Sequence, residues 1–429
     1  MALSVFLILV IAMIVSIPIG VAIGLSSIYP GLINPHFAAN VQFVIRGMVS
    51  GIDSTPILAV PLFILSGFIM ARGEIAKKLF DVFAYFVGNK TAGMPIAVVL
   101  TSLFYGAISG SGIATTAAVG GMCIPILISM GYDKVFSAAL VATAGGLGVI
   151  IPPSIPFIMY GLTTGVSVGA LFTAGILPGI LIGLFLMSCA YIYCRKYGED
   201  KEKINANYKL LREKGFLNVF KESFWALMTP VIILGGIYSG IVTPTEAACI
   251  SVFYSLFVCV FIYRTMKINE IIVSLKETVK SIAPLSLLLS LAVVFGRVLA
   301  MLRAPELLGN FIVSNFANTT VLLLVMNMIL LILGMFMDVG PAIVILAPIL
   351  LPVMQKFGVD PVHLGIIMTT NLAIGFVTPP FGVDLFVASP LINTPVMEIG
   401  KKAIPFIISF IFAMLLITYI PEISLILLR

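Results

Sequence analysis

Two stretches of the chain carry the same spaced set of turn-forming residues. Each member of the second set lies 227 positions after its partner, so that Pro125, Gly131, Asp133, Gly148, Pro152 and Pro153 pair with Pro352, Gly358, Asp360, Gly375, Pro379 and Pro380. Chance matches among apolar residues would not readily place two Pro-Pro pairs and two Gly-x-Asp turns in one register. The pattern predicts a duplicated unit in which each copy carries a helix broken at the same place. Interrupted apolar segments in corresponding halves are typical of transporter binding sites.

The composition places these copies in a membrane. Hydrophobic residues make up 60% of the chain and charged residues 10%, against about 25% charged residues in an ordinary soluble domain. Roughly ten to twelve segments approach the length of about 20 apolar residues that a bilayer crossing needs. The first, from about Leu3 to Ile28, lacks the basic start and cleavage site of a signal peptide, so we expect a permanent span. The sequence thus predicts an all-α polytopic protein of the bacterial inner membrane, surrounded by lipid.

The positive charges separate two halves of the chain. The net charge is +6, but Lys and Arg gather in short connectors between apolar segments, as in cytoplasmic loops, so no nucleic-acid partner is expected. The one long polar stretch predicts a cytoplasmic linker over 195–223, with a surface helix near 208–221. It divides a first half, 1–194, from a second half, 224–429.

The loop charges favour opposite orientations of the two copies in the membrane, that is, inverted repeats whose copies meet at a binding site. In each copy we expect a re-entrant hairpin followed by a broken helix. The expected hairpins cover about 101–130 and 330–354, and the expected broken helices cover about 134–162 and 361–389.

The expected hairpin tips differ in chemistry. In the first copy Ser109, Gly110, Ser111 and Gly112 interrupt an apolar run, and such irregular backbone is tolerated at membrane depth where it lines a cavity or is buried in protein. The alternative is close helix packing through small residues. The second tip instead carries Asp338, which either ligates a cation directly or caps the following helix.

Consecutive prolines unwind the broken helices and free backbone carbonyls. With hydroxyls beside them and neither Cys nor His, these oxygens suit a sodium ion better than a transition metal. The candidate cation ligands are Ser109, Gly110, Gly148, Gly334, Asp338, Gly375 and Thr378. We expect sodium as the coupling ion and no organic cofactor.

The sequence offers fewer candidate substrate contacts than candidate cation ligands. Arg297 lies within an apolar segment, where its guanidinium either anchors a substrate carboxylate or forms a structural ion pair. Asp384 is either its ion-pair partner or a solvated loop residue. The other candidates are Ser111, Ser154 and Asn371. No nucleophile with a base and no metal-ligand spacing is found, and His363 belongs to a helix start capped by Asp360, so an enzyme is not expected.

The segments 358–363, 371–375 and 378–382 (GVDPVH, NLAIG and TPPFG) resemble the large membrane subunit of tripartite ATP-independent periplasmic (TRAP) transporters. Segments 109–112 and 152–154 resemble the first half of that subunit. The resemblance covers essentially the whole chain and implies an elevator-type fold of the ion-transporter superfamily, with both hairpins in the moving domain. It also implies sodium sites at Ser109, Ser111, Gly334, Gly375 and Thr378, with Arg297 and Ser154 facing substrate.

The function implied by the resemblance is sodium-coupled import of an organic anion, such as a C4-dicarboxylate or a sugar acid such as sialic acid. Two partners are implied: a periplasmic binding protein that delivers the substrate and a small four-helix membrane subunit. Because the chain starts directly at the first span of the large subunit, we expect the small subunit to be a separate chain. The alternative is a stand-alone ion-coupled carboxylate carrier of the same superfamily that needs no binding protein.

Overall fold

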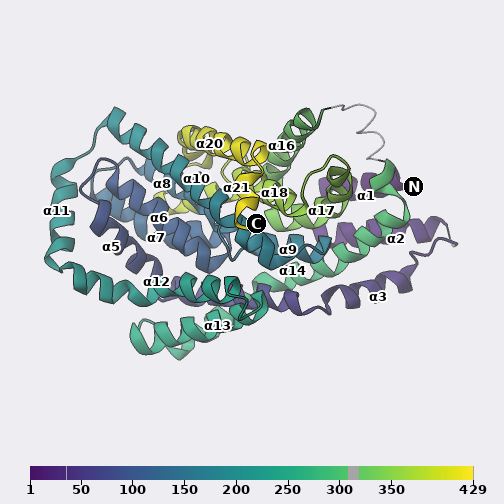
Figure 1. Ribbon diagram of the computed structural model, residues 1–429, viewed down its shortest axis with the longest axis horizontal. Helices are drawn as coiled ribbons and strands as arrows, with labels where there is room; N and C mark the ends of the chain where they lie inside the picture. Colours follow the sequence, from purple (N-terminus) through teal and green to yellow (C-terminus); the bar gives the residue numbers. More distant parts are fainter. Residues whose placement is uncertain (35, 308–317, 429) are drawn as a thin grey trace.

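The computed structural model describes residues 1–34, 36–307 and 318–428, and these residues form helices joined by short connections (Figure 1). Nine of the described helices are long and apolar enough to cross a membrane. This confirms the predicted all-α polytopic class. The second half as predicted, 224–429, includes residues 308–317 and 429, which lie outside the described residues.

The elements follow the chain as a series of helices that ends near the middle of the molecule in Figure 1. The first ten are α1 (Ala2–Ile14), α2 (Ile19–Ile33), α3 (Val41–Ile52), α4 (Ala59–Arg72), α5 (Ile75–Val87), α6 (Gly93–Ser109), α7 (Gly112–Ser129), α8 (Lys134–Gly145), α9 (Ile155–Thr164) and α10 (Val168–Tyr197). The others are α11 (Lys201–Glu213), α12 (Phe216–Tyr238), α13 (Pro244–Phe257), α14 (Ile268–Met301), α16 (Thr319–Phe336), α17 (Val339–Lys356), α18 (Pro361–Gly375), α19 (Val383–Ile392), α20 (Val396–Tyr419) and α21 (Glu422–Leu425).

The Gly-x-Asp turns have the same local structure in both copies. Gly131 and Gly358 have φ angles of +90° and +77°, a conformation in which a side chain would be strained. Two residues later, Asp133 and Asp360 accept hydrogen bonds from backbone N–H groups in the first turns of α8 and α18. The same cap chemistry therefore starts the broken helix in each copy.

Each broken helix follows a helical hairpin. The first hairpin is α6–α7, with its tip at Gly110 and Ser111, and the second is α16–α17, with its tip at Met337 and Asp338. Both are longer than expected at the end that precedes the tip, because no turn residue interrupts their apolar first arms. After the hairpins, the chain breaks between α8 and α9 and between α18 and α19, where the two Pro-Pro pairs lie.

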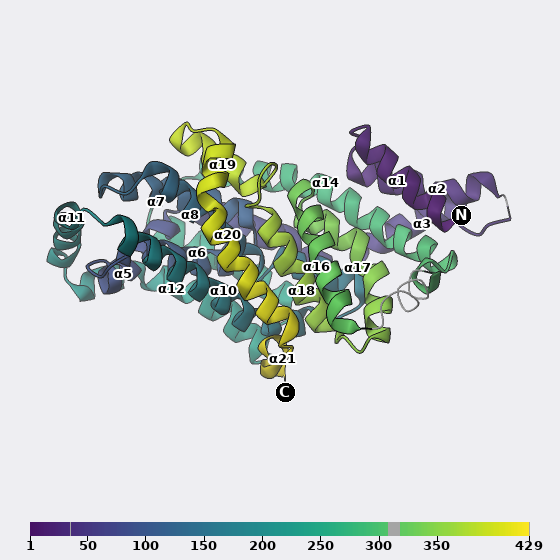
Figure 2. The same ribbon diagram turned by 90° about the horizontal axis from the view of Figure 1, so that it is seen from above.

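The two copies pack into each other rather than side by side. Helix α19 of the second copy lies against α7 and α8 of the first (Figure 2). Helix α9 of the first copy lies against α17 of the second. The Tyr160 hydroxyl in α9 donates to the Pro361 carbonyl at the start of α18, at 2.7 Å. We call α6–α9 and α16–α19 together the paired bundle; α10 and α20 pack on it.

A second group of helices, α2–α5 and α12–α14, flanks the paired bundle and is here called the framework. Its longest member, α14, has 34 residues and packs on α2, α3 and α4. The same helix also contacts α9 and α17 of the paired bundle, so it joins the two groups. Helix α13 packs on α4, and α12 packs on α5 and α13.

The first apolar segment is not a single span. Helix α1 ends at Ile14 and α2 begins at Ile19, with Ser16 in a left-handed conformation (φ 64°) and Pro18 before α2. Neither helix reaches the length of about 20 residues that a crossing needs. The prediction of one span from Leu3 to Ile28 is therefore wrong, because the turn at residues 15–18 ends the helix.

The linker helix also lies elsewhere than predicted. Helix α11 begins at Lys201, where Asp200 caps it, and it ends before Gly215, whose φ is +76°. The predicted surface helix near 208–221 is wrong, since this break divides it between α11 and α12. The Arg212 guanidinium lies 4.5 Å from the centre of the Tyr85 ring, and this contact holds α11 against α5.

One buried carboxylate fastens the linker to the paired bundle. Glu199 accepts hydrogen bonds from the Tyr132 hydroxyl (2.6 Å) and the Ala92 N–H (3.0 Å), and it pairs with Lys201 (2.8 Å). Ala92 immediately precedes α6, and Tyr132 lies between α7 and α8. Burial and the hydrogen bond to Glu199 raise the pKa of the Tyr132 hydroxyl above its ordinary value. Glu199 therefore ties the end of α10 to both connections of the first hairpin.

We expect Glu199→Ala to destabilise this end of the protein by about 1–3 kcal/mol, because the buried Ala92 N–H and the half-buried Tyr132 hydroxyl lose their acceptor. Hydrogen–deuterium exchange would report the loss as faster exchange of the amide of Ala92. The matched control is Glu202→Ala, since Glu202 is exposed on α11. Equal exchange rates in the two variants would contradict the fastening role.

Candidate functional site

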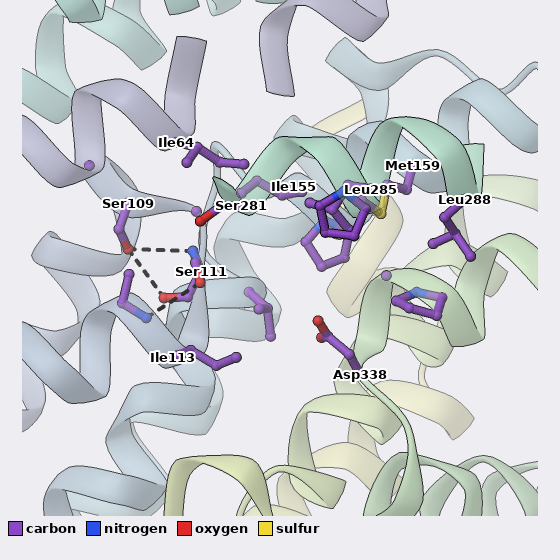
Figure 3. Close-up of a pocket in the computed structure, with 18 of the residues that line it drawn as sticks. Ile64, Ser109, Ser111, Ile113, Ile155, Met159, Ser281, Leu285, Leu288 and Asp338 are labelled. Carbon is purple, nitrogen blue, oxygen red and sulfur yellow. Dashed lines mark hydrogen bonds between the residues drawn. The ribbon is translucent and has the colours of Figure 1, made fainter. Parts of the chain in front are cut away.

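A cavity of about 640 Å³ lies between the paired bundle and the framework (Figure 3). The first hairpin, α9 and the second hairpin form one side, and α2, α4 and α14 contribute the other. Most of the lining is apolar. The polar side chains that face it are Ser109, Ser111, Ser281 and Asp338. Figure 3 shows the two hairpin serines on one side and Asp338 across the cavity from them.

Four helices present their N-terminal turns to the cavity. The lining includes Ile19 of α2, Ile113 of α7, Ile155 of α9 and Gly340 of α17. A helix N-terminus carries about half a positive charge and attracts anions, although the first N–H groups of α9 already have acceptors. Among the described residues that line the cavity there is no Lys or Arg. An anion here would be held by backbone N–H groups and hydroxyls.

The first hairpin tip gathers oxygen atoms. The Ser109 and Thr115 hydroxyl oxygens lie 2.9 Å apart, and Thr115 donates to the Ser111 carbonyl at 2.8 Å. Gly148 of the broken helix packs directly on this group, because a Cβ there would overlap the Thr115 hydroxyl and the Ser111 carbonyl. Gly110, at φ +62°, forms the turn itself. The structure therefore brings the four predicted residues together and adds Thr115, which the sequence analysis did not single out.

The second group forms where α16 meets the break after α18. The backbones of Gly334 and Gly375 are in contact, so that a Cβ at Gly375 would overlap backbone atoms of Gly334. The Thr378 N–H donates to the Gly375 carbonyl at 3.1 Å, and its hydroxyl donates to the Ile374 carbonyl at 2.8 Å. These three predicted cation ligands, Gly334, Gly375 and Thr378, lie together.

Asp338 stands at the tip of the second hairpin, in the register position of Ser111. Each is the N-cap residue of the second hairpin helix, and the two positions differ by the same 227 residues. Ser111 accepts a hydrogen bond from the Ala114 N–H, whereas Asp338 makes no side-chain capping bond. The carboxylate faces the cavity, and both roles, cation ligand and helix cap, stay predictions.

Two further candidates, Ser154 and Asn371, make hydrogen bonds inside the paired bundle. The Ser154 hydroxyl donates to the Val149 carbonyl at 2.5 Å and caps α9, and its side chain is fully buried. The Asn371 amide donates to the Asn327 side chain at 2.9 Å, which joins α18 to α16. Ser111 lines the cavity, but neither Ser154 nor Asn371 does.

Arg297 lies away from the cavity in this structure. It follows the last cavity-lining residue of α14, Leu288, by nine positions, which is about 13 Å along a helix. Its guanidinium donates to the Ser50 hydroxyl of α3 at 3.2 Å. The described ion pairs do not include it. Among the described residues, Arg297 therefore contacts the framework and does not line the cavity.

The predictions for Asp384 are wrong. Its side chain is fully buried in the first turn of α19, and it is neither solvated nor paired with Arg297. Sequence reasoning also missed the α14 wall of the cavity, from Ser281 to Leu288, and the ring of Phe376. A uniformly apolar helix gives no sign in its sequence of which face borders a cavity.

Comparison with known proteins places these features in a family context. The sequence profile described as "Tripartite ATP-independent periplasmic transporter, DctM component" matches residues 4–423. The chain is 42% identical over 411 residues to the isethionate TRAP transporter permease protein DctMQ of Oleidesulfovibrio alaskensis, covering 96% of this chain and 64% of that protein. It is 41% identical over 370 residues to the C4-dicarboxylate TRAP transporter large permease protein DctM of Pseudomonas aeruginosa (86% and 85% covered).

A third relative, the sialic acid TRAP transporter large permease protein SiaM of Vibrio cholerae, is 35% identical over 390 residues, covering 91% of this chain and 90% of that protein. Among solved structures, the YdaH transporter of Alcanivorax borkumensis is similar with a TM-score of 0.60 at 13% identity, covering 89% of each chain. At this identity the similarity extends to the fold alone.

Proposed function

Because this chain belongs to the DctM family, the large membrane subunits of TRAP transporters, we propose that it imports an organic anion together with sodium. It is a multi-pass protein of the bacterial inner membrane, in a family of transporter permeases. The observation that carries the proposal is the charge pattern of the cavity. Four helix N-termini favour an anion there, and one carboxylate opposes it.

The proposed substrate is a small organic anion. The relatives are named for isethionate, C4-dicarboxylates and sialic acid, all of which carry a sulfonate or carboxylate group. Helix N-termini and the hydroxyls of Ser109, Ser111 and Ser281 can bind the oxygens of such a group. The apolar walls on α14 and α9 then contact the carbon skeleton.

The position of Asp338 supports the proposed sodium coupling. An ionised carboxylate and an anionic substrate about 6 Å apart repel by about 3 kcal/mol at an effective dielectric constant of about 20, which is roughly a hundredfold in affinity. A cation bound at the hairpin oxygens or at Asp338 would remove this repulsion. Each ligand would therefore strengthen binding of the other.

The proposed movement is of the elevator type, with inverted repeats in the moving part. In support, the paired bundle is internally interlocked, whereas its contact with the framework at the hairpin tip runs through a glycine. A Cβ at Gly67 of α4 would lie 3.3 Å from Ser109 Cα. The Tyr105 hydroxyl makes a long hydrogen bond of 3.4 Å to the Gly67 carbonyl. Small residues at such an interface allow close helix approach without interdigitating side chains.

The proposed partners are a small four-helix membrane subunit and a periplasmic substrate-binding protein, as family membership implies. The test is uptake into proteoliposomes that contain this chain and the small subunit, with the binding protein outside. Isethionate, C4-dicarboxylates and sialic acid would be offered in turn. We expect uptake of one of them to require an inward sodium gradient and both partners. Uptake by this chain alone would contradict the tripartite arrangement and support a stand-alone carrier.

The cation ligands can be tested in the same assay. We expect the double substitution Ser109→Ala with Thr378→Ala to lower the initial rate of sodium-driven uptake at least about tenfold, since each lost ligand costs about 1.4 kcal/mol or more of cation affinity. The control is Ser129→Ala, because Ser129 is exposed at the far end of α7. Unchanged uptake in the double variant would show that the ligand assignment is wrong.

A further inference from the structure

A carboxylate without a partner is buried behind the tip of the first hairpin. Asp384 is fully buried, and neither of its side-chain oxygens makes a hydrogen bond. The Thr116 hydroxyl of α7 is also fully buried and unpartnered. Unpartnered buried oxygens are rare in native structures. Their occurrence on two neighbouring helices makes this spot a candidate binding site.

Three segments surround this spot: α7, the C-terminal end of α8, and the first turn of α19, which packs on both (Figure 2). A Cβ added at Gly145 would lie 3.2 Å from Asp384 Oδ2 and would overlap the Thr116 hydroxyl. A Cβ added at Gly112 would lie 3.4 Å from Asp384 Oδ2 and 3.3 Å from the Gly145 carbonyl oxygen. Two glycines therefore allow the carboxylate, a hydroxyl and a carbonyl to approach one another closely.

The buried negative charge of Asp384 favours a bound cation. An isolated ionised carboxylate costs several kcal/mol to bury, even after the protein relaxes. The nearby C-terminus of α8 carries about half a negative charge and raises this cost. The ion pairs of the described residues do not include Asp384.

The chemical types of the oxygens suit a hard cation. Carboxylate, hydroxyl and backbone carbonyl oxygens are the ligands that such ions take, and one of each lies at this spot.

We propose that the Asp384 carboxylate, the Thr116 hydroxyl and the Gly145 carbonyl form a sodium site separate from the two hairpin groups, an inference that rests on the proposed sodium coupling. The site has no counterpart in the first copy, because the position 227 residues before Asp384 is Phe157. A sodium ion there joins α19 of one copy to α7 and α8 of the other.

Phe376 connects this site to the cavity. Its side chain lines the cavity, and its carbonyl accepts a hydrogen bond from the Asp384 N–H at 3.0 Å. A Cβ at Gly112 would lie 3.1 Å from the Phe376 ring. Sodium binding behind the tip therefore fixes both the first turn of α7 and the ring that borders the substrate cavity.

The test is equilibrium binding of radioactive sodium to the purified complex of this chain with its small subunit, in choline chloride at constant ionic strength. We expect Asp384→Asn to lower the number of ions bound at saturation by one. Thr116→Val, which keeps the shape and removes the hydroxyl, should keep the number and weaken one site about tenfold. The control Asp53→Asn, at an exposed position, should match the wild type.

The hairpin variant separates this inference from the proposed function. The double variant Ser109→Ala with Thr378→Ala should lose the sodium ions bound at the two hairpin groups and should retain the ion at Asp384. An unchanged number of ions in Asp384→Asn overturns the new site while leaving the hairpin sites intact, whereas a wild type that binds no sodium refutes the coupling altogether. Should Asp384→Asn fail to fold, the melting temperature of Thr116→Val decides: stabilisation by sodium equal to that of the wild type overturns the site.

Discussion

Replacing Gly375 by alanine is expected to abolish uptake and to lower the thermal stability of the protein by several degrees. The added Cβ would overlap the Cα, carbonyl carbon and carbonyl oxygen of Gly334. These are backbone atoms, so no change of rotamer can relieve the overlap, and α16 must move away from α18. Overpacking of this kind costs about 1–3 kcal/mol or more. The melting temperature of the purified protein and the rate of sodium-driven uptake measure the two effects.

The matched control is Gly121→Ala. Gly121 lies in the middle of α7, and a Cβ there would meet no atom within 4 Å. Alanine is favoured over glycine in a helix by about 1 kcal/mol, so this variant should be as stable as the wild type or slightly more stable. Equal melting temperatures for the two variants would contradict the backbone contact between α16 and α18.

Replacing Asp338 by asparagine is expected to separate substrate binding from sodium. Without the negative charge, the anion no longer needs a cation beside it, so its affinity in sodium-free buffer should rise, by up to about a hundredfold. Accumulation against a gradient should be lost, because sodium no longer favours the loaded state. Calorimetric titration of the transported anion, with and without sodium, measures the first effect, and proteoliposome uptake measures the second.

Two variants control this experiment. Asp338→Glu keeps the charge at the hairpin tip and should keep the sodium dependence of binding, whereas Asp53→Asn removes an exposed charge outside the cavity lining and should change neither measurement. An Asp338→Asn variant whose substrate binding still depends fully on sodium would show that this carboxylate does not mediate the coupling.

The sequence was informative where the structure depends on local backbone chemistry. Gly131 and Gly358 hold positive φ angles, and Asp133 and Asp360 cap the helices that follow. Such turns need particular residues at fixed offsets, so the duplicated register and the position of both hairpin tips could be predicted. The limits of the hairpins could not be predicted, because their apolar first arms continue without a turn signal.

The hydrogen-bond partners of buried polar residues explain the failures. Ser154 and Asn371 carry polar groups near the breaks, but the first bonds Val149 in its own copy, and the second bonds Asn327 across two helices. A polar residue does not reveal from sequence which of its neighbours will take its hydrogen bonds. The meeting of Thr116 with Asp384 depends on α19 packing against the other copy, which no local pattern encodes.

The most direct test of the whole account is a cryo-electron microscopy structure of the complex with sodium and the transported anion. The account predicts density for the anion in the cavity between Ser111 and Asp338, beside Ser281 of α14, and density for sodium at the hairpin oxygens. Anion density bound instead by the Arg297 guanidinium, with this cavity empty, would contradict it.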